Sequence, residues 1–309
     1  MRYLYLSDGE NNAQYRTLLT DLLNEGIRVP SPQGEAAYRL PPAMLVYDLR
    51  NDTGDKDRIT LPVPDRACKN MTFSAIGEII GFINGAATVE ELEKYGCNRS
   101  WWEPWTSREY LDHCELDLKT GSLGRGSYGV TLHDLPTPEG PFNQVRNVME
   151  QIQELPFLRT HLMTTWSPPY VFRGKGKKRQ VAVAPCHGTV INFSVDMEKN
   201  ELSLHHVQRS GDVPVGVAGN IIQYVALLLM AAHLGGYKPG MYYHFILDPH
   251  MYERQRDPVK SYLEETKPTP FPKLVLKNTG ITDIFAFRNT DFDLEGYIER
   301  PKIRIPTPI

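Results

Sequence analysis

The chain has 309 residues, of which 41% are hydrophobic and 23% are charged, and its formal net charge is −3. These values are ordinary for a globular protein, so they indicate neither disorder nor a fibrous fold, and the length allows one large domain or two smaller ones. The acidic balance argues against broad binding to nucleic acid or to a membrane surface. An anionic ligand would therefore have to be held by a local basic cluster.

Cysteine usage and hydropathy narrow the cellular setting. There is no CxxC pair and no metal-ligand spacing among the four cysteines, Cys68, Cys97, Cys114 and Cys186. The first five residues do not resemble a signal peptide, and the longest apolar run, 221–234, is interrupted by Gln223 and His233 and is too short to span a bilayer. We therefore expect no bound metal, no membrane segment and a reducing, cytoplasmic setting, which would be the host cytoplasm if a phage encodes the chain.

Periodic hydrophobic residues predict the elements of the first part of the chain. An amphipathic helix over 14–25 is followed by a strand over 43–49 and by a core-facing helix over 73–83. Thr88 is placed to cap a further short helix. The polar stretch 51–60 is expected to be a surface insertion within a single domain that covers residues 1–309.

Two features of this first part invite a functional interpretation. Glu78 lies inside the core-facing helix, where the ordinary expectation is a solvated side chain, because glutamate is rarely buried without a partner. Three tryptophans within 101–105 are usual for local core, but they can also form the flat wall of a pocket for an aromatic ligand. The glycine-rich stretch 121–129 matches neither a phosphate loop nor a dinucleotide fingerprint, and we expect a loop that presents Tyr128.

The second part of the chain is expected to be richer in strands. The basic run 173–179 is expected to be a solvated hairpin tip, because one short cluster gives little of the phosphate neutralisation that nucleic-acid binding needs. The runs 181–195 and 201–208 predict a hairpin with Cys186 on or just before its first strand. The other elements are predicted by periodicity and turn residues: helices over 143–155 and 220–234, and strands over 161–166, 242–247, 273–277 and 281–287.

The dipeptide Cys186-His187 precedes an Arg-Ser-x-Asp cluster by about twenty residues. A thiol and an anion-binding group that one fold could bring together point to nucleophilic chemistry. The alternative is a buried cysteine that packs as a small hydrophobe beside a strand histidine, since free cysteine is among the most buried residue types.

Taken in order, the motifs resemble those of the thymidylate synthase superfamily. The matching runs cover most of the chain from about residue 14: EIIGFING at 78–85, WEPW at 102–105, 123–129, APCH at 184–187, QRSGD at 208–212, 216–220, DPHMY at 248–252 and 292–297. The resemblance implies an α+β fold in which a large mixed β-sheet packs against helices and uses one face for dimerisation. It implies folate-dependent one-carbon transfer to carbon 5 of a deoxypyrimidine monophosphate, with methylenetetrahydrofolate as cosubstrate and no metal.

The same resemblance assigns the catalytic roles. Cys186 would add to carbon 6 of the pyrimidine as a thiolate, which turns the ring into an enolate that can attack a one-carbon electrophile. Glu78 would be the general acid and base, and Tyr128 would assist removal of the proton at carbon 5. The folate site would be lined by Trp102, Trp105, Gly216 and Asp212, of which Asp212 also counts among the catalytic residues. The tail, 304–309, would close over the site and exclude water.

Substrate binding is also assigned by the resemblance. Arg209 would hold the nucleotide phosphate with Ser210 and Arg28, and Arg159 would come from the partner subunit, which implies a homodimer. Asn220 would read the pyrimidine edge and favour dUMP over dCMP, because the deoxycytidylate branch has aspartate at that place. His250 and Tyr252 would hydrogen-bond the sugar 3′-hydroxyl. The full set of substrate-binding residues that the resemblance implies is Arg28, Arg159, Gln208, Arg209, Ser210, Asn220, His250 and Tyr252.

Departures from the family pattern bear on the product. The loop after Arg28 is altered, Ala218-Gly219 replaces Pro-Phe, Thr160 replaces an arginine, and the folate-side lysine is missing near Cys68. On these grounds deoxyuridylate hydroxymethylation is slightly favoured over thymidylate formation. A dCMP hydroxymethylase and a non-catalytic nucleotide-binding homologue are further alternatives, and the second of these would be expected to lack the nucleophile or the acid and base.

Overall fold

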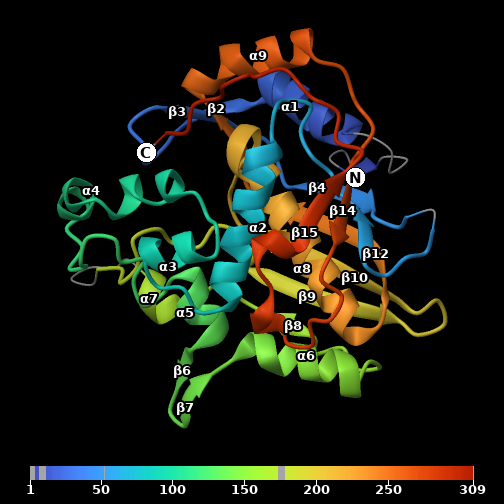
Figure 1. The fold of residues 1–309 in the computed structure, drawn as a ribbon. Helices are drawn as coiled ribbons and strands as arrows, with labels where there is room; N and C mark the ends of the chain where they lie inside the picture. Colours follow the sequence, from blue (N-terminus) through green and yellow to red (C-terminus); the bar gives the residue numbers. More distant parts are fainter. Residues whose placement is uncertain (1–3, 7–11, 52, 173–177, 309) are drawn as a thin grey trace.

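The computed structural model describes residues 4–6, 12–51, 53–172 and 178–308, and a mixed six-stranded sheet lies at its centre (Figure 1). Strand β10 runs parallel to β12 and antiparallel to β9, and β1 runs parallel to β4. The strands, in their order across the sheet, are β1 (Leu4–Leu6), β4 (Ala43–Asp48), β12 (Lys238–Ile246), β10 (Glu201–Gln208), β9 (Val190–Asp196) and β8 (Leu162–Met163).

Alternation along β10 separates the two faces of this sheet. Leu202, Leu204, His206 and Gln208 are buried, whereas the residues between them are only half-buried, because successive side chains of a strand point to opposite faces. Helix α8 (Ala218–Gly235) covers the buried face, where the ring of Tyr224 stacks on His206 at 3.8 Å between centroids. Dimerisation through the other, half-buried face stays a prediction.

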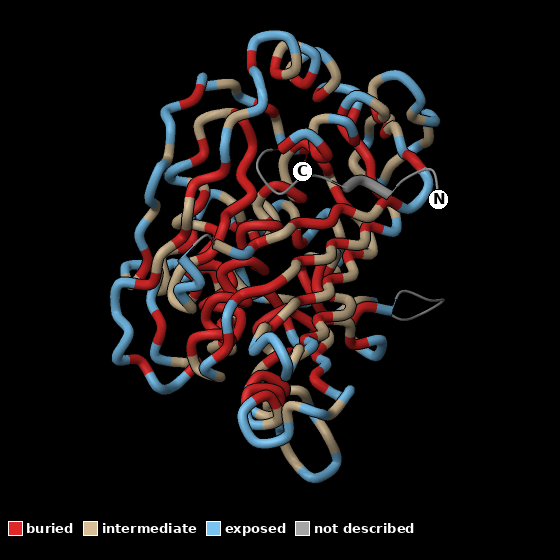
Figure 2. The backbone as a smooth tube through the Cα atoms, turned by 90° about the vertical axis from the view of Figure 1, so that its right-hand side faces the viewer, coloured by how far each residue is buried: buried red, intermediate tan, exposed pale blue. Residues whose placement is uncertain are grey.

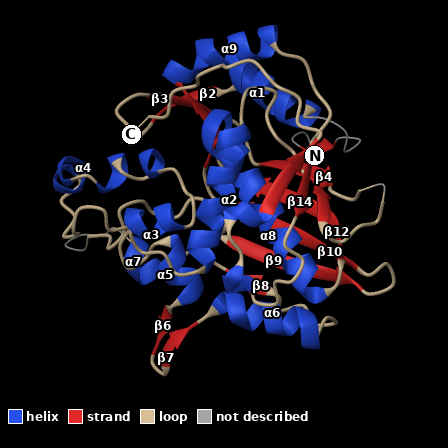
Figure 3. Ribbon diagram, in the orientation of Figure 1, coloured by secondary structure: helices blue, strands red, loops and turns tan. Residues whose placement is uncertain are grey.

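Helix α2 (Lys69–Ile83) forms the next layer and packs against α8 (Figure 3). Most of its residues from Thr72 to Ile83 are buried, and they include Glu78. Figure 2 shows that buried segments run through the centre of the molecule, where the sheet and these helices meet. The stretch Val213–Gly235 is long and apolar enough to cross a membrane, but it is mostly buried within the protein, as expected of a core helix.

Smaller sheets and helices surround this centre. The four-stranded sheet contains β11 (Gly211–Asp212), β13 (Pro249–Tyr252), β3 (Ala36–Arg39) and β2 (Ile27–Pro30). The other two sheets are β15 (Phe292–Glu295), β14 (Lys273–Leu276) and β5 (Arg58–Thr60), and the hairpin β6 (Leu135–Thr137) and β7 (Gly140–Phe142). The remaining α-helices are α1 (Ala13–Glu25), α3 (Val89–Lys94), α4 (Arg108–His113), α5 (Tyr128–His133), α6 (Gln144–Glu154), α7 (Pro168–Val171) and α9 (Arg256–Glu265). The fold is α+β, as predicted.

The predicted helices are confirmed and their ends have clear causes. Thr88 accepts a hydrogen bond from the backbone N–H of Glu91, whose carboxylate accepts from Thr88 N in return, so α3 begins with a complete capping box. Helix α8 ends where Gly236 takes a left-handed conformation, with φ of 74°, which glycine adopts without a steric penalty.

Several predicted loops and strands are corrected. The strand expected over 281–287 is wrong, because the Asp283 side chain accepts from Phe285 N and starts a 3-10 turn, Ile284–Ala286. The strand expected from residue 181 begins only at Val190. Tyr128 opens helix α5 instead of lying in a loop.

Two surface stretches need separate comment. The stretch 51–60 ends in β5, whose Ile59 and Thr60 are buried, so its last three residues belong to a sheet and are not a surface turn. The predicted tip at 173–179 falls mostly on 173–177, which lie outside the described residues.

Candidate active site

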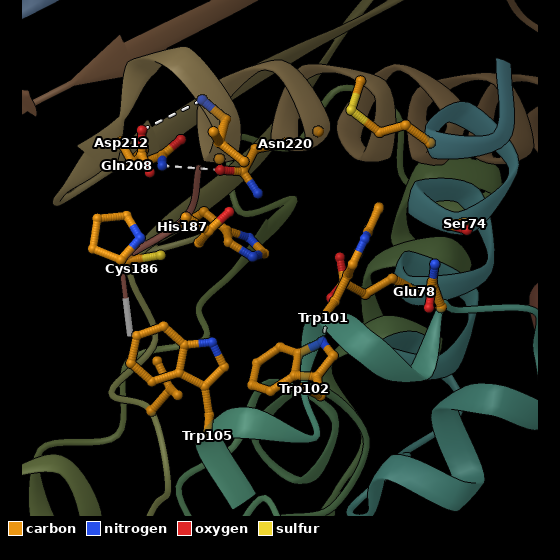
Figure 4. A pocket seen from close by; sticks show the side chains of 18 of the residues that line it. Ser74, Glu78, Trp101, Trp102, Trp105, Cys186, His187, Gln208, Asp212 and Asn220 are labelled. Carbon is orange, nitrogen blue, oxygen red and sulfur yellow. Dashed lines mark hydrogen bonds between the residues drawn. The ribbon is translucent and has the colours of Figure 1, made fainter. Parts of the chain in front are cut away.

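A cavity of about 550 Å³ lies between α2, the tryptophan segment, α5, the Cys186 loop and the start of α8 (Figure 4). Its lining includes most of the side chains that the sequence singles out. Those residues are Glu78, Trp102, Trp105, Tyr128, Cys186, Gln208, Asp212, Gly216, Asn220 and Tyr252. Segments far apart in the sequence therefore present their polar groups to one cavity.

Cys186 lies in a loop that side chains hold in place. The guanidinium of Arg209 donates to the carbonyl of Pro185 at 2.7 Å and to that of Ala184 at 2.9 Å. The backbone N–H of Cys186 donates to the hydroxyl oxygen of Tyr128 at 2.7 Å. Because that oxygen already accepts, the Tyr128 proton is free to be donated to the Cys186 sulfur, 3.3 Å away.

The environment of the thiol contains opposing influences. Burial raises the pKa of the Cys186 thiol, while the hydrogen bond from Tyr128 and the positive charge of Arg209 act in the other direction. Arg209 also lies over the ring of Trp166, with 5.1 Å from the guanidinium carbon to the ring centroid. The arginine thus supports the loop and favours the thiolate from the same position.

Glu78 is buried and each of its carboxylate oxygens accepts a hydrogen bond, so the solvated alternative is wrong. Its two carboxylate oxygens accept from the indole N–H of Trp102 and from the side-chain amide of Gln223. Burial raises the pKa of the Glu78 carboxyl to about 7, and the hydrogen bond from Trp102 limits the rise. A carboxyl group that titrates near neutrality can both give and take a proton in one catalytic cycle.

A row of side-chain amides connects Glu78 to the sheet. The Gln208 amide donates to Asn220 Oδ1 at 3.0 Å, and the Asn220 amide donates to Gln223 Oε1 at 3.0 Å. His244 Nε2 lies 2.9 Å from Gln208 Oε1 at the other end of the row. The side chain expected to read a pyrimidine is therefore held between two glutamines.

His187 is part of the wall behind the cysteine. Its ring stacks on Tyr128 at 4.3 Å between centroids, and its Nδ1 lies 2.9 Å from the hydroxyl of Tyr224. Burial lowers the pKa of His187 to about 3, so the imidazole is neutral at physiological pH. This environment suits a packing and hydrogen-bonding role better than that of a base for the thiol.

The rest of the cavity wall is rich in tryptophan and includes a second carboxylate, that of Asp212. Trp101, Trp102 and Trp105 line it, and Trp102 also belongs to the hydrophobic core. The segment 101–105 therefore contributes both to the core and to the wall of a pocket. Asp212 accepts from Val215 N and from the Gln255 amide, and burial raises the pKa of its carboxyl, with nearby His250 opposing the rise.

The tail is fastened close to Asp212, because the Gln255 amide contacts both. Gln255 donates to the carbonyl of Pro306 at 2.8 Å, and Thr307 and Pro308 line the cavity. The predicted tail therefore reaches the site, except for Ile309, which lies outside the described residues.

Five of the predicted residues are not among the cavity-lining residues. They are Arg28, Arg159, Arg209, Ser210 and His250. Arg28 forms an exposed ion pair with Glu253 at 3.2 Å, and Arg159 is exposed. Ser210 donates weakly to Asp248 at 3.4 Å, and His250 Nδ1 lies 3.0 Å from the carbonyl of that aspartate. Their roles in nucleotide binding stay predictions.

Other lining residues were missed in the sequence. They include Arg66, Asn70, Ser74 and Asn98. Arg66 donates to the carbonyl of Pro214 at 3.1 Å and places a positive charge at the cavity. It lies two residues before Cys68, where the family's folate-side lysine is missing. No spacing rule marks it, because it lies in a turn ahead of α2. Gln223 did carry a signal, since it interrupts an apolar run three residues after Asn220.

Within the described part of the chain, no group of three or more histidine, cysteine, aspartate or glutamate side chains is arranged to hold a metal ion.

Comparison with known proteins agrees with this geometry. The family model described as thymidylate synthase matches residues 13–309. Over 317 aligned residues the chain is 30% identical to a thymidylate synthase of Saccharomyces cerevisiae, and the alignment covers 96% of this chain and 98% of the yeast protein. The chain therefore belongs to the thymidylate synthase family and is a methylenetetrahydrofolate-dependent one-carbon transferase.

Proposed function

We propose that the protein transfers a one-carbon unit to carbon 5 of dUMP and that its product is dTMP. The observation that carries the proposal is the convergence of Cys186, Glu78 and Asn220 on one cavity. These residues supply a nucleophile, an acid and base, and a side chain that can read the pyrimidine. Such a combination suits addition to carbon 6 followed by substitution at carbon 5.

In this proposal Cys186 forms the S–C6 bond, and the electron pair displaced from the C5–C6 double bond activates carbon 5. The Tyr128 hydroxyl, 3.3 Å from the sulfur, stabilises the thiolate by a hydrogen bond. After carbon 5 has taken up the one-carbon unit it loses its proton, and the bond between that unit and the tetrahydrofolate nitrogen breaks. The exocyclic methylene then takes a hydride from tetrahydrofolate, which is oxidised to dihydrofolate, and the S–C6 bond breaks and releases the thiolate.

Glu78 would handle protons at the pyrimidine carbonyl, because its carboxyl pKa of about 7 makes both protonation states accessible. Asn220 carries a donor and an acceptor on one amide, which matches the O4 and N3–H of uracil. The absence of an aspartate at position 220 supports dUMP over dCMP.

The aromatic side of the cavity fits a folate cosubstrate. The tryptophans offer flat surfaces for the pterin ring, and Asp212 offers acceptors for its N–H groups. Arg66 adds a positive charge that suits the carboxylates of the folate tail. The cavity therefore has a cation even though the family's lysine is missing. The loss of that lysine is then no longer a reason to doubt that tetrahydrofolate reduces the intermediate.

The hydroxymethylation that the sequence slightly favoured has no support from the comparisons, since the similar yeast protein is a thymidylate synthase. It remains the second candidate because of one observation. A Cβ atom built on Gly219, which lines the cavity beside Asn220, would meet no atom within 4 Å. That open space can hold a water, and water attack would give the hydroxymethyl product.

Phosphate binding is proposed for Arg28, Arg209 and Ser210, and for Arg159 across a homodimer interface. The exposure of Arg28 and Arg159 supports this proposal, because both guanidinium groups remain accessible to a ligand or to a second subunit. Nucleic acid and membrane are not proposed as partners.

The test is an assay of purified protein with carbon-5-tritiated dUMP and methylenetetrahydrofolate, with the nucleotide product identified by mass. Tritium release with dTMP as the product supports the proposal, and 5-hydroxymethyl-dUMP would replace it by the second candidate. Conversion of dCMP without conversion of dUMP would contradict the role given to Asn220.

A further inference from the structure

The row of amides between His244 and Glu78 has a fixed direction. Each neighbouring pair has a donor facing an acceptor, and every donor points toward Glu78. A side-chain amide can in principle be turned by half a rotation, which exchanges its donor and its acceptor. The two ends of the row decide which way each amide faces.

At one end, Gln223 faces a group that only accepts. An ionised carboxylate has no proton to donate, so the Gln223 amide must direct its N–H at Glu78. Its oxygen then faces Asn220, which must present its own N–H. Gln223 is fully buried, so water cannot replace either contact.

At the other end, Gln208 is fixed independently. Its amide N–H also donates to the backbone carbonyl of Ser210 at 3.0 Å, and a carbonyl can only accept. The same N–H group therefore faces Asn220 Oδ1. Both ends impose the same orientation on the Asn220 amide.

This orientation matters for the base that is read. Uracil offers an N–H at position 3 and an acceptor at position 4, whereas cytosine offers the reverse pattern. A turned Asn220 would suit cytosine, but its N–H would face that of Gln208 and its oxygen would face that of Gln223. Turning Gln223 as well would place its oxygen against the Glu78 carboxylate.

We propose that Gln223 is a positioning and specificity-determining residue, which locks the Asn220 amide in the orientation for uracil and couples that orientation to the ionised state of Glu78. The inference rests on the proposed function and deepens it. Among the described titratable groups, Cys97, Cys186 and Tyr224 interact electrostatically with Glu78, and none of these three makes a hydrogen bond with the Gln223 amide.

The test compares Gln223→Met with the parent protein. Methionine has a similar length and offers no N–H, so the ratio of kcat/KM for dUMP to that for dCMP should fall by about tenfold or more. Loss of the donor should also move the acid limb of the pH profile to higher pH, because an unpaired carboxylate is easier to protonate. A merely structural role would change neither quantity.

Gln144→Met is the matched control. Gln144 is another buried glutamine and does not line the cavity. Its amide donates to the carbonyl of Thr131 in α5 and to that of Thr164, which follows β8. It should keep the parental ratio and profile. If Gln223→Met does not fold, Gln223→Leu, which also offers neither donor nor acceptor, is measured in its place.

The outcomes separate the two proposals. An unchanged ratio and pH profile in a folded Gln223 variant, with dUMP turnover in the parent, would overturn the lock alone. Absence of tritium release from dUMP in the folded parent would overturn the proposed function. In that case calorimetric binding of dUMP and dCMP to the parent and to the variant still tests the lock, and an equal preference in both would overturn it.

Discussion

The hydroxyl oxygen of Tyr128 lies 2.7 Å from the backbone nitrogen of Cys186 and 3.3 Å from its sulfur. One side chain therefore fixes both the backbone and the nucleophilic atom of the cysteine. Since Phe82 stacks on Tyr128 at 4.7 Å between ring centroids, the tyrosine is itself held by the core. The position of the nucleophile is thus set from α5 and α2 as well as from its own loop.

Tyr128→Phe should lower kcat by about tenfold to a hundredfold, because the thiolate loses a hydrogen bond of roughly 1.5–3 kcal/mol. The pH at which Cys186 reacts with iodoacetamide should rise. Steady-state kinetics and a pH series of alkylation rates measure the two effects. Tyr237→Phe, which removes a buried hydroxyl bonded to the carbonyl of Ile152, is the control and should leave both unchanged.

Arg209→Met should loosen the loop that carries the cysteine. Two hydrogen bonds to the carbonyls of Ala184 and Pro185 disappear, so the free energy of unfolding should fall by about 1–3 kcal/mol and turnover should fall with it. Chemical denaturation gives the stability. Arg50→Met, which removes exposed ion pairs with Asp48 and Glu201, should cost less than about 1 kcal/mol. Equal losses in both variants would contradict the special role of Arg209.

Glu78 makes stability depend on pH with a definite sign. Its pKa rises from the ordinary value of 4.5 to about 7 in the folded protein, so the unfolded chain releases this proton first. Stability is therefore highest below the unfolded pKa and falls as pH rises through the folded pKa, by up to about 3 kcal/mol from this group.

Glu78→Gln should remove that loss along with the general acid and base. Its free energy of unfolding should exceed that of the parent above pH 7 and approach it near pH 4, while turnover falls by several orders of magnitude. Urea denaturation across this pH range measures the difference. A variant that is less stable than the parent at pH 8 would show that the Glu78 contacts outweigh its desolvation.

Removal of residues 307–309 should affect chemistry more than nucleotide binding. Thr307 and Pro308 line the cavity near the proposed folate site. The hydrogen bond from the Gln255 amide to the Pro306 carbonyl would remain after the truncation. We expect kcat to fall at least about tenfold as water enters, while the Kd for dUMP changes little. Calorimetry and steady-state kinetics separate the two quantities, and an equal loss in both would contradict a covering role for the tail.

Much of this architecture follows from local pattern. The helices α1, α2, α6 and α8 were predictable because their apolar residues recur at helical spacing and glycine or N-cap residues mark their ends. The loop of Cys186 was not, because its apolar residues resemble a strand and the contacts that hold it come from Arg209 and Tyr128, which are distant in the sequence. The 3-10 turn at Ile284–Ala286 was missed for a similar reason, since one capping aspartate outweighs a run with strand propensity.

The site was predictable where residues fall in ordered motifs. Glu78, Cys186 and Asn220 were identified in this way, and the cavity brings them together. Arg66 was missed because a turn residue carries no periodic signal. The pairing of Gln223 with Glu78 depends on the packing of α8 against α2, which no local pattern encodes.

The most direct test of the account uses 5-fluoro-dUMP with methylenetetrahydrofolate. Fluorine at carbon 5 cannot leave as a proton does, so the adduct at carbon 6 should accumulate on the nucleophile. Mass spectrometry of peptides should find the nucleotide on Cys186, with Cys68, Cys97 and Cys114 unmodified. A folded protein that binds the nucleotide but carries no adduct on Cys186, or carries it on another cysteine, would contradict the central claim.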